Sequence, residues 1–560
     1  MSKSKLTLVF VCLLLTPFCF ANGESEVSCA VCGLVVAAVQ GLILANKTEA
    51  EFVQLFDTYA CPLIKQKSFF TLDVCQGIVR MYAPTVWPIL FDGFVQPTAL
   101  CRLFHACDTD GDSIDLVRSD MKRLAREIGA LRAPLPAARK KRASTAPRAA
   151  PFRAGGPLRI LQISDVHVDS MYVVGSNADC ADPLCCRHSD AANASALASV
   201  WGAHTCDLSP AMFVSFQQYA STLQNIDAVI VTGDLTPHDI WNETLVEQLT
   251  RITAVNAALV KAFANVAPVF IALGNHDTVA CDLSQSVLPR SLLIHDDFRW
   301  LYDGIANTWS LPPGALKTLR QGGYYAAQLA PGLKLLAINS QAFNNENFYM
   351  FVNATRDVPQ LSWMASELRS SQATGEKVIV AGHIPLRYAT NEGASILDQF
   401  LDLLVQYNGT IVGQLFGHTH HDDFQMVGRN GVDVGVQFIA PSLTTFTNQN
   451  PSFRIFELDP TTFAFQDYVQ YRANLDDAIR TGAPQWEVAY TARDEYGLAD
   501  LSPASMKALI ARFASNATLF DDFSQNFQAG QPKRVDARWK KQAICNMLGT
   551  TEGEVKRCLN

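Results

Sequence analysis

The segment Leu161-Gln162-Ile163-Ser164-Asp165-Val166-His167 is a short apolar run that ends in Asp-x-His. Four later segments share this design, because each is an apolar run followed by a metal-binding type of side chain. They are Val229–Asp234, Phe270–Asp277, Val378–His383 and Gly413–His420. Short apolar runs are typical of buried strands, and ligands of open α/β sheets gather at the carboxyl ends of strands. We therefore expect five strand ends to bring together two Asp, one Asn and four His, enough for two metal ions.

Length and charge limit the class of protein. The chain has 560 residues, of which 49% are apolar, and a formal net charge of −8. This length supports a large core and predicts roughly two to four folded units. The acidic balance argues against a nucleic-acid partner, because a general nucleic-acid binder has a basic stripe.

The N-terminus has the pattern of a secretory signal peptide, which we place at residues 1–21. Lys3 and Lys5 precede an apolar run from Leu6 to Phe20. A signal anchor is the alternative, although the run is short for a membrane-spanning helix. A secreted or lysosomal chain passes through an oxidising route, where disulfides are expected. Six Asn-x-Ser/Thr sequons agree with that route: Asn46, Asn193, Asn242, Asn353, Asn408 and Asn516.

Six cysteines lie in a stretch of helical character near the N-terminus: Cys29, Cys32, Cys61, Cys75, Cys101 and Cys107. Their spacing resembles that of the saposin B-type domain, a small all-α disulfide-linked fold, which we place at residues 25–110. The resemblance implies the nested bridges Cys29–Cys107, Cys32–Cys101 and Cys61–Cys75, since six cysteines alone leave the pairing open. It also implies contact with lipid. Val86–Phe91 is the candidate membrane-facing patch, and the alternative is that it forms only the core of the module.

A linker is predicted over residues 111–157. From Arg132 to Pro157 the chain is rich in Ala, Pro and Arg and lacks apolar periodicity, as in an extended tether. The basic run Arg139–Arg142 is interpreted as a solvated charge run or one attracted to anionic lipid. A cleavage site for a processing protease is the alternative.

Residues 158–471 alternate strand-like runs with helical stretches at 209–223, 243–265 and 396–407, which predicts an α/β sandwich. The ordered blocks Asp-x-His, Gly-Asp, Gly-Asn-His-Asp, Gly-His and Gly-His-x-His are similar to those of the calcineurin-like metallophosphoesterase family. Two divalent ions in such a site clamp the attacking and leaving oxygens of a phosphoryl displacement. This domain is therefore expected to be a binuclear phosphoesterase.

The resemblance also implies which side chains bind the ions. Asp234 matches the carboxylate that bridges both ions. The remaining ligands are Asp165, His167 and His420 at one ion, and Asn275, His383 and His418 at the other. Histidine-rich ligation suits zinc better than magnesium or calcium. The expected cofactor is therefore two Zn²⁺.

Two further histidines are expected to act on the phosphate. His276 follows a ligand directly, and His238 lies in Gly-Asp-x-x-x-His-Asp-x-Trp, which resembles the acid sphingomyelinase family. A general acid there would be a protonated imidazole, which is abundant only at mildly acidic pH. The same resemblance places Glu346 near the choline-binding end of the substrate. It places Phe453 where the family usually has Tyr, so that an aromatic face could take a cation.

The resemblance implies three more disulfides, Cys180–Cys185, Cys186–Cys206 and Cys545–Cys558. Cys281 is then left over, as a buried unpaired thiol or as a link to another chain. Residues 472–560 have a helical pattern and are expected to form a C-terminal helical domain. The predicted fold class is thus an α+β multidomain chain.

The resemblance implies a phospholipase C-type phosphodiesterase that hydrolyses sphingomyelin to ceramide and phosphocholine. We expect a monomer that is secreted or lysosomal and associates peripherally with membrane lipid through the saposin-like domain. One alternative is a phosphodiesterase of nucleotides or other soluble diesters, against which the saposin-like domain argues. Another is a catalytically dead lipid-binding protein, against which the complete set of ligands argues.

Overall fold

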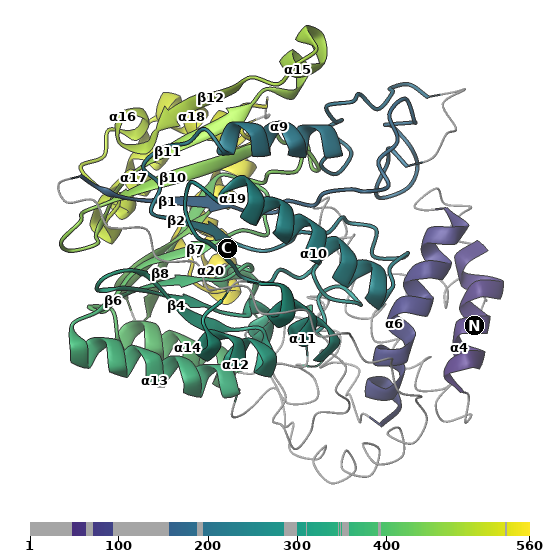
Figure 1. Cartoon of the computed structure of the whole chain (residues 1–560), viewed down its shortest axis with the longest axis horizontal. Coiled ribbons are helices and arrows are strands. Elements are labelled where there is room, and N and C mark those ends of the chain that lie inside the picture. The colour runs from purple at the N-terminus through teal and green to yellow at the C-terminus, as the bar shows by residue number, and fades with distance from the viewer. Residues whose placement is uncertain are drawn as a thin grey trace.

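The structure is a computed structural model (Figure 1). It describes residues 48–62, 71–92, 156–187, 194–284, 299–309, 311–344, 346–347, 349, 358–389, 394–429, 431–531 and 535–560. The expected signal peptide, nearly all of the linker, and the pairings Cys29–Cys107 and Cys32–Cys101 lie outside these residues. The side chains of Val86–Phe91 lie outside them too.

Two six-stranded mixed sheets build the central domain. The first has the order β12-β11-β10-β1-β2-β3, and the second has the order β4-β5-β6-β7-β9-β8. The strands of the first are β1 (Leu158–Ile163), β2 (Ala228–Val231), β3 (Val269–Ile271), β10 (Ser452–Leu458), β11 (Phe465–Ala473) and β12 (Trp486–Thr491). Those of the second are β4 (Tyr325–Ala330), β5 (Leu333–Ala337), β6 (Lys377–Ala381), β7 (Ile411–Phe416), β8 (Asp423–Arg429) and β9 (Val432–Ile439).

The two sheets pack against each other through aromatic side chains. The rings of Phe438 on β9 and Phe456 on β10 have centroids 5.4 Å apart. Every residue of β2 is buried, because this strand lies inside its sheet and is covered on both faces. Parallel pairing of β1 with β2 and of β2 with β3 places their carboxyl ends at one edge. The α/β sandwich predicted from the sequence is therefore confirmed.

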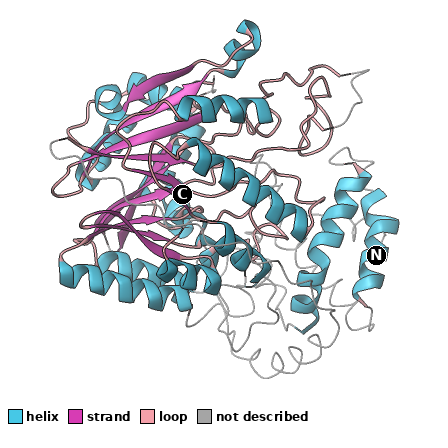
Figure 2. Cartoon of the chain, in the orientation of Figure 1, coloured by secondary structure: helices cyan, strands magenta, loops and turns pink. Residues whose placement is uncertain are grey.

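Helices surround the two strand layers (Figure 2). Around the sandwich lie α9 (Pro210–Ala220), α10 (Leu245–Ala262), α11 (Arg299–Thr308), α12 (Pro313–Gly322), α13 (Pro359–Thr374), α14 (Ala394–Gln406) and the short turns η5 (Ser340–Phe343) and η7 (Leu386–Tyr388). The start of α9 is specified locally, because Ser209 caps it and Pro210 occupies its first turn. The helices α9, α10 and α14 confirm the three stretches predicted as helical.

The C-terminal part contains α15 (Leu475–Thr481), α16 (Ala492–Tyr496), α17 (Pro503–Ser515), α18 (Ala517–Phe527), α19 (Ala537–Leu548) and α20 (Glu552–Leu559). It is not purely helical, because β12 pairs with β11 and continues the first sheet. The expected boundary at residue 471 falls inside β11. A sheet edge left without a partner exposes backbone donors and acceptors, and β12 satisfies those of β11. The predicted Cys545–Cys558 bridge is confirmed and joins α19 to α20.

The N-terminal module lies at one end of the molecule (Figure 1) and contains α4 (Glu49–Leu55), η1 (Phe56–Ala60) and α6 (Leu72–Asp92). The predicted Cys61–Cys75 bridge is confirmed. Helix α6 contacts the loops after β2 and β3. A Cβ on Gly77 would lie 2.3 Å from the carbonyl oxygen of Trp241, and the hydroxyl of Tyr82 donates to the carbonyl of Cys281 at 3.3 Å. None of the described helices combines the length and apolar character needed to cross a membrane.

Candidate active site

The seven predicted metal ligands all lie in loops that directly follow strands, after β1, β2, β3, β6 and β7. Five of them have left-handed backbone, a conformation that non-glycine residues rarely adopt. They are Asp165 (φ 50°), His167 (φ 39°), Asp234 (φ 57°), His418 (φ 73°) and His420 (φ 63°). Such strained positions cluster at functional sites. The strain therefore marks the same edge of the sandwich that the sequence singled out.

Glycines in the ligand blocks allow these loops to approach one another closely. A Cβ on Gly417 would lie 1.8 Å from Oγ of Ser164 and 2.7 Å from Oδ2 of Asp165. The backbone N–H of His418 donates to both carboxylate oxygens of Asp165, at 3.0 and 3.1 Å. Contacts this short leave no room for a side chain. The glycine before His418 is therefore needed to join the loops after β1 and β7.

His167 and His383 meet at one carboxylate oxygen. Their Nε2 atoms lie 3.4 and 3.0 Å from Oδ2 of Asp234. Each ring uses Nδ1 for a backbone carbonyl at 2.6 Å, that of Thr236 for His167 and that of Thr232 for His383. A carbonyl only accepts, so Nδ1 carries the hydrogen and the lone pair of Nε2 is available to a metal.

The other predicted ligands complete this cluster. Nδ1 of His418 lies 3.0 Å from Oδ1 of Asn275. Nε2 of His420 lies 3.6 Å from Oδ1 of Asp165. The structure thus brings together members of both expected sites around Asp234.

The buried carboxylates and imidazoles of the site form an environment that favours a bound cation. Burial lowers the pKa of His167 and of His418 well below the ordinary value. Burial also opposes the charged form of His383, but the carboxylates of Asp234 and Asp165 outweigh it and raise its pKa to about 9. Buried carboxylates beside mostly neutral imidazoles need a positive charge, which a divalent ion would supply. Apart from their contacts with Asp234, the Nε2 atoms of His167 and His383 have no hydrogen-bond partner among the described residues, as expected of atoms oriented toward a metal.

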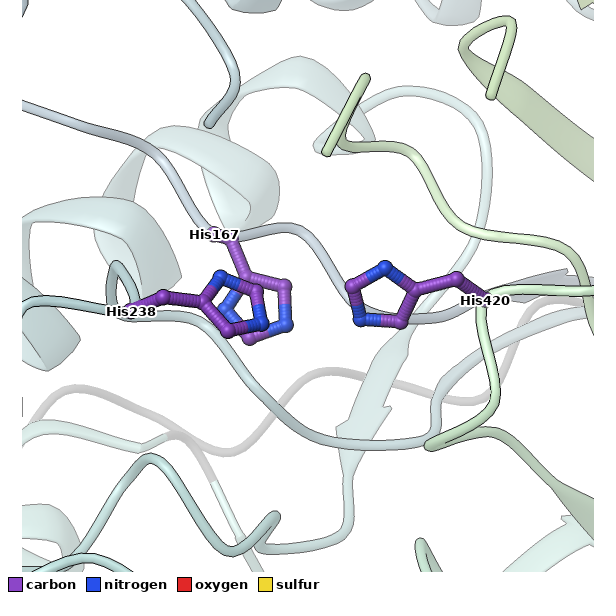
Figure 3. Close-up of side chains that lie close together, drawn as sticks. All are labelled: His167, His238 and His420. Atoms are coloured by element: carbon purple, nitrogen blue, oxygen red, sulfur yellow. The ribbon is translucent and has the colours of Figure 1, made fainter. Parts of the chain in front are cut away.

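His238 lies against the metal ligands. Its ring stacks on that of His167 at 3.8 Å and lies 4.3 Å from that of His276. Figure 3 shows the rings of His167 and His238 stacked, with the ring of His420 facing them. Nitrogen atoms of these three histidines lie within 4.8 Å of one another. Burial and the neighbouring His420 lower the pKa of His238 well below its usual range.

The two predicted substrate residues differ in their placement. Glu346 is half-buried beside Asp282, and burial and that carboxylate raise its pKa well above the ordinary value. The prediction for Phe453 is wrong, because this side chain is 0% exposed and belongs to the core of the first sheet. It stacks on Tyr471 at 4.8 Å and meets Phe216 at 5.5 Å, so it offers no face to a ligand.

The cysteines of this domain behave as predicted. Cys180 bonds Cys185 and Cys186 bonds Cys206. Cys281 is unpaired and buried. Its sulfur accepts from the amide of Asn275 at 3.6 Å, next to a predicted ligand.

Sequence reasoning missed several carboxylates that support the site. Oδ2 of Asp277 accepts the backbone N–H groups of Gly274 and Asp234, and its Oδ1 accepts that of Leu235. Asp207 accepts from the backbone and the ring of His238. The position of Asp277 inside the Gly-Asn-His-Asp block was a signal for its role, whereas no local pattern marks Asp207.

Two family models match parts of this chain. Residues 158–422 match the calcineurin-like phosphoesterase family, and residues 432–560 match the acid sphingomyelin phosphodiesterase C-terminal region. Sphingomyelin phosphodiesterase A of Dictyostelium discoideum is 30% identical over 555 residues, which cover 96% of this chain and 92% of that protein.

Two shorter matches add to the comparison. Sphingomyelin phosphodiesterase of Homo sapiens is 34% identical over 387 residues, which cover 67% of this chain and 60% of that protein. A cyclic GMP-AMP phosphodiesterase of Mus musculus is 30% identical over 391 residues, which cover 66% of this chain and 83% of that protein. The site and the matches show a phosphodiesterase that uses divalent metal ions. The chain belongs to the acid sphingomyelin phosphodiesterase family.

Proposed function

We propose that this chain hydrolyses sphingomyelin to ceramide and phosphocholine at acidic pH, with two zinc ions bound. The observation that carries the proposal is the meeting of His167 and His383 on one oxygen of Asp234. A carboxylate in this position can bridge two ions. The substrate is inferred from the similarity to sphingomyelin phosphodiesterases, one of which aligns with 96% of this chain.

The residues present fit two zinc ions. Four imidazoles, two carboxylates and one amide oxygen form the ligand set, and a histidine-rich set favours zinc. When bound, such a pair of ions supplies a nucleophilic water that ionises near neutral pH and a clamp for the phosphate oxygens. The chain contributes the hydrogen bonds from Nδ1 of His167 and His383 to backbone carbonyls, which orient Nε2 of both rings toward Asp234.

The chain's own residues would then handle the leaving group. Asp207 accepts from Nδ1 of His238, so the proton available for transfer is the one on Nε2. An anionic phosphodiester beside this ring opposes the effect of burial and raises its pKa. His238, with His276 next to it, would protonate the ceramide oxygen as the phosphorus–oxygen bond breaks.

Helix α6 suggests how a lipid reaches this site. It packs on the loops that carry His238 and His276, through Gly77 against Trp241 and Tyr82 against Cys281. A saposin-like module in this position would hold membrane lipid next to the metals. Glu346 is the candidate for pairing with the choline ammonium, because its half-buried carboxyl gains a charge when a cation approaches.

The test is phosphocholine release from sphingomyelin vesicles at about pH 5, where free histidine is mostly protonated. The full chain is assayed with and without a zinc chelator, beside a soluble cyclic dinucleotide. Chelator-sensitive release supports the proposal. Turnover of the dinucleotide without release of phosphocholine contradicts the sphingomyelin assignment and keeps the metal site.

A nucleotide phosphodiesterase is the second candidate, favoured by the likeness to the mouse cyclic GMP-AMP phosphodiesterase. The N-terminal module argues for lipid, because a soluble diester does not need lipid presentation. The catalytically dead alternative is disfavoured, since all seven candidate ligands are present in the loops that follow the strands.

A further inference from the structure

The two halves of one disulfide are each followed directly by a residue that holds the His238 loop. Cys186 bonds Cys206 with their Cα atoms 5.9 Å apart. Arg187 follows the first half and Asp207 follows the second. The disulfide therefore fixes the positions of a cation and a carboxylate that act on neighbouring residues of one loop.

Asp207 sets the orientation of the His238 ring. The carboxylate is fully buried. Its Oδ2 accepts the backbone N–H of His238 at 2.7 Å, and its Oδ1 lies 2.7 Å from Nδ1 of the same residue. Thr444 donates to Oδ1 as well, at 3.3 Å. With backbone and ring both held by one carboxylate, Nε2 is directed toward the metal ligands.

Arg187 links this loop to the loop of a metal ligand. Its Nε and Nη2 donate to the two carboxylate oxygens of Asp169, at 2.8 and 2.7 Å. Its Nη1 donates to Asp239, which also accepts from Arg251 at 3.1 Å. Asp169 is two residues from His167, and Asp239 is adjacent to His238. The guanidinium therefore holds the loops after β1 and β2 at a fixed separation.

Regular secondary structure contributes little to the placement of Arg187 and Asp207, although Leu208 pairs with Val168 and the carbonyl of Cys206 accepts from the hydroxyl of Thr445. Between β1 and α9, the described residues form only isolated bridges, such as Asn177 with Leu197. The buried residues here make a small cluster separate from the main core: Ala178, Cys185, Cys186, Ala198 and Cys206. A segment with so small a core depends on its disulfides for order.

We propose that the Cys186–Cys206 bridge positions His238 for the reaction, acting through Arg187 and Asp207. This inference rests on the proposed role of His238 as the donor of a proton to the leaving oxygen. Arg187 and Asp207 are positioning residues, because Asp207 holds the ring of His238 and Arg187 holds the neighbouring Asp239. Loss of the bridge would lower the rate of proton donation and leave the metals bound.

Substrates with different leaving groups distinguish a positioning role of the Cys186–Cys206 bridge from a general structural role. An alkoxide, such as that of ceramide or a ribose, needs a proton as it leaves, whereas p-nitrophenolate is stable without one. A misoriented His238 therefore slows alkoxide-releasing substrates selectively. A partly unfolded or metal-depleted enzyme loses both activities in the same proportion.

The experiment compares two disulfide knockouts in the full chain, C186A/C206A and C180A/C185A. The second removes a bridge in the same segment that is not adjacent to Arg187 or Asp207. Each is assayed with sphingomyelin vesicles and with bis(p-nitrophenyl) phosphate, and bound zinc is measured by mass spectrometry. We expect C186A/C206A to lower kcat on sphingomyelin about 100-fold, in the range of lost general acid catalysis. Its activity on the nitrophenyl ester should change less than about fivefold, with zinc retained.

Two results with the disulfide knockouts would overturn the inference, and one result with D207N would as well. One is an equal loss on both substrates in C186A/C206A. The other is the same selectivity in C180A/C185A. D207N, which keeps the shape of the side chain, covers the case in which C186A/C206A does not fold: full activity of D207N on sphingomyelin also contradicts the inference.

The same experiment can be done if sphingomyelin is not the substrate. If the chain does not hydrolyse sphingomyelin, a cyclic dinucleotide replaces it as the alkoxide-releasing substrate. The ratio of the two activities then tests the role of the bridge as before.

Discussion

Nε2 of His383 lies 3.0 Å from Oδ2 of Asp234, and the two residues come from different sheets. His383 follows β6 and Asp234 follows β2, so this contact joins the sandwich at its active edge. The pair holds together the ligands of both proposed ions. Several measurable consequences follow from it and from the packing around it.

Replacing Asp234 by Asn should empty the site. The amide keeps the shape but cannot hold two cations with its charge, so D234N should lose bound zinc and about 10³-fold in kcat/KM. Zinc content by mass spectrometry and vesicle turnover check this. D402N is the matched control, because the side chain of Asp402 is 67% exposed and pairs with Arg429 in a surface ion pair. Full zinc occupancy in D234N would contradict the bridging role.

Replacing Gly417 by Ala should disrupt the contact between the loops after β1 and β7. The new Cβ would lie 1.8 Å from Oγ of Ser164, so the loop that carries His418 must move. We expect zinc affinity to fall at least about tenfold, as when groups that support metal ligands are lost. Zinc titration with a competing chelator measures it. G409A is the control, because a Cβ on Gly409 meets nothing within 4 Å. Equal affinities of the two variants would refute the prediction.

Replacing Gly77 by Ala should lower the turnover of sphingomyelin vesicles without changing the hydrolysis of a soluble diester. The Cβ would collide with the carbonyl of Trp241 and weaken the packing of α6 on the catalytic loops. Alanine favours helix over glycine, so α6 itself is not weakened. Vesicle turnover should fall several-fold while bis(p-nitrophenyl) phosphate hydrolysis stays unchanged. G314A, in open space on α12, controls for the substitution. Equal loss of both activities in G77A would mean that α6 supports the site itself.

The buried carboxyl group of Glu243 should make the stability of the folded protein depend on pH. It is 5% exposed, and neither carboxylate oxygen has a hydrogen-bond partner among the described residues. Burial and the nearby Asp239 raise its pKa well above 4.5, against the opposing effect of Arg251 and Arg187. Since the folded-state pKa lies above the unfolded one, stability from this group is complete below about pH 4.5 and falls as pH rises through the folded pKa.

E243Q removes this titration. Calorimetry should therefore show a higher Tm for E243Q than for the unmodified chain at pH 7, by about 2 °C or more. The difference should shrink toward zero at about pH 4, where the carboxyl is protonated in both states. E487Q, at an exposed position on β12, should show no such trend. A Tm difference that is the same at both pH values would show that Glu243 does not titrate as expected.

Local patterns in the sequence were enough to select the strand-end residues that the structure brings together. Each candidate ligand follows an apolar run, and a short run of this kind is typical of a buried strand. The confirmed disulfides came from a family resemblance instead, because cysteine spacing does not determine pairing.

The errors concern residues whose role depends on a distant neighbour. Phe453 was predicted to face the substrate, but successive side chains of a strand point to opposite faces, and the pairing of β10 with β1 and β11 puts Phe453 in the aromatic core. The strand β12 was missed because its residues become a strand by pairing with the edge of β11.

The support of His238 also required the tertiary structure. Asp207 precedes His238 by 31 residues, and Arg187 precedes Asp239 by 52. Nothing in the composition of either segment indicates these contacts. By itself, the sequence determined which side chains end each strand, because strand and turn propensities act over a few residues. Only the packed sandwich and the Cys186–Cys206 bridge decided which distant carboxylate holds which histidine, because such contacts exist only after the chain has closed its long loops.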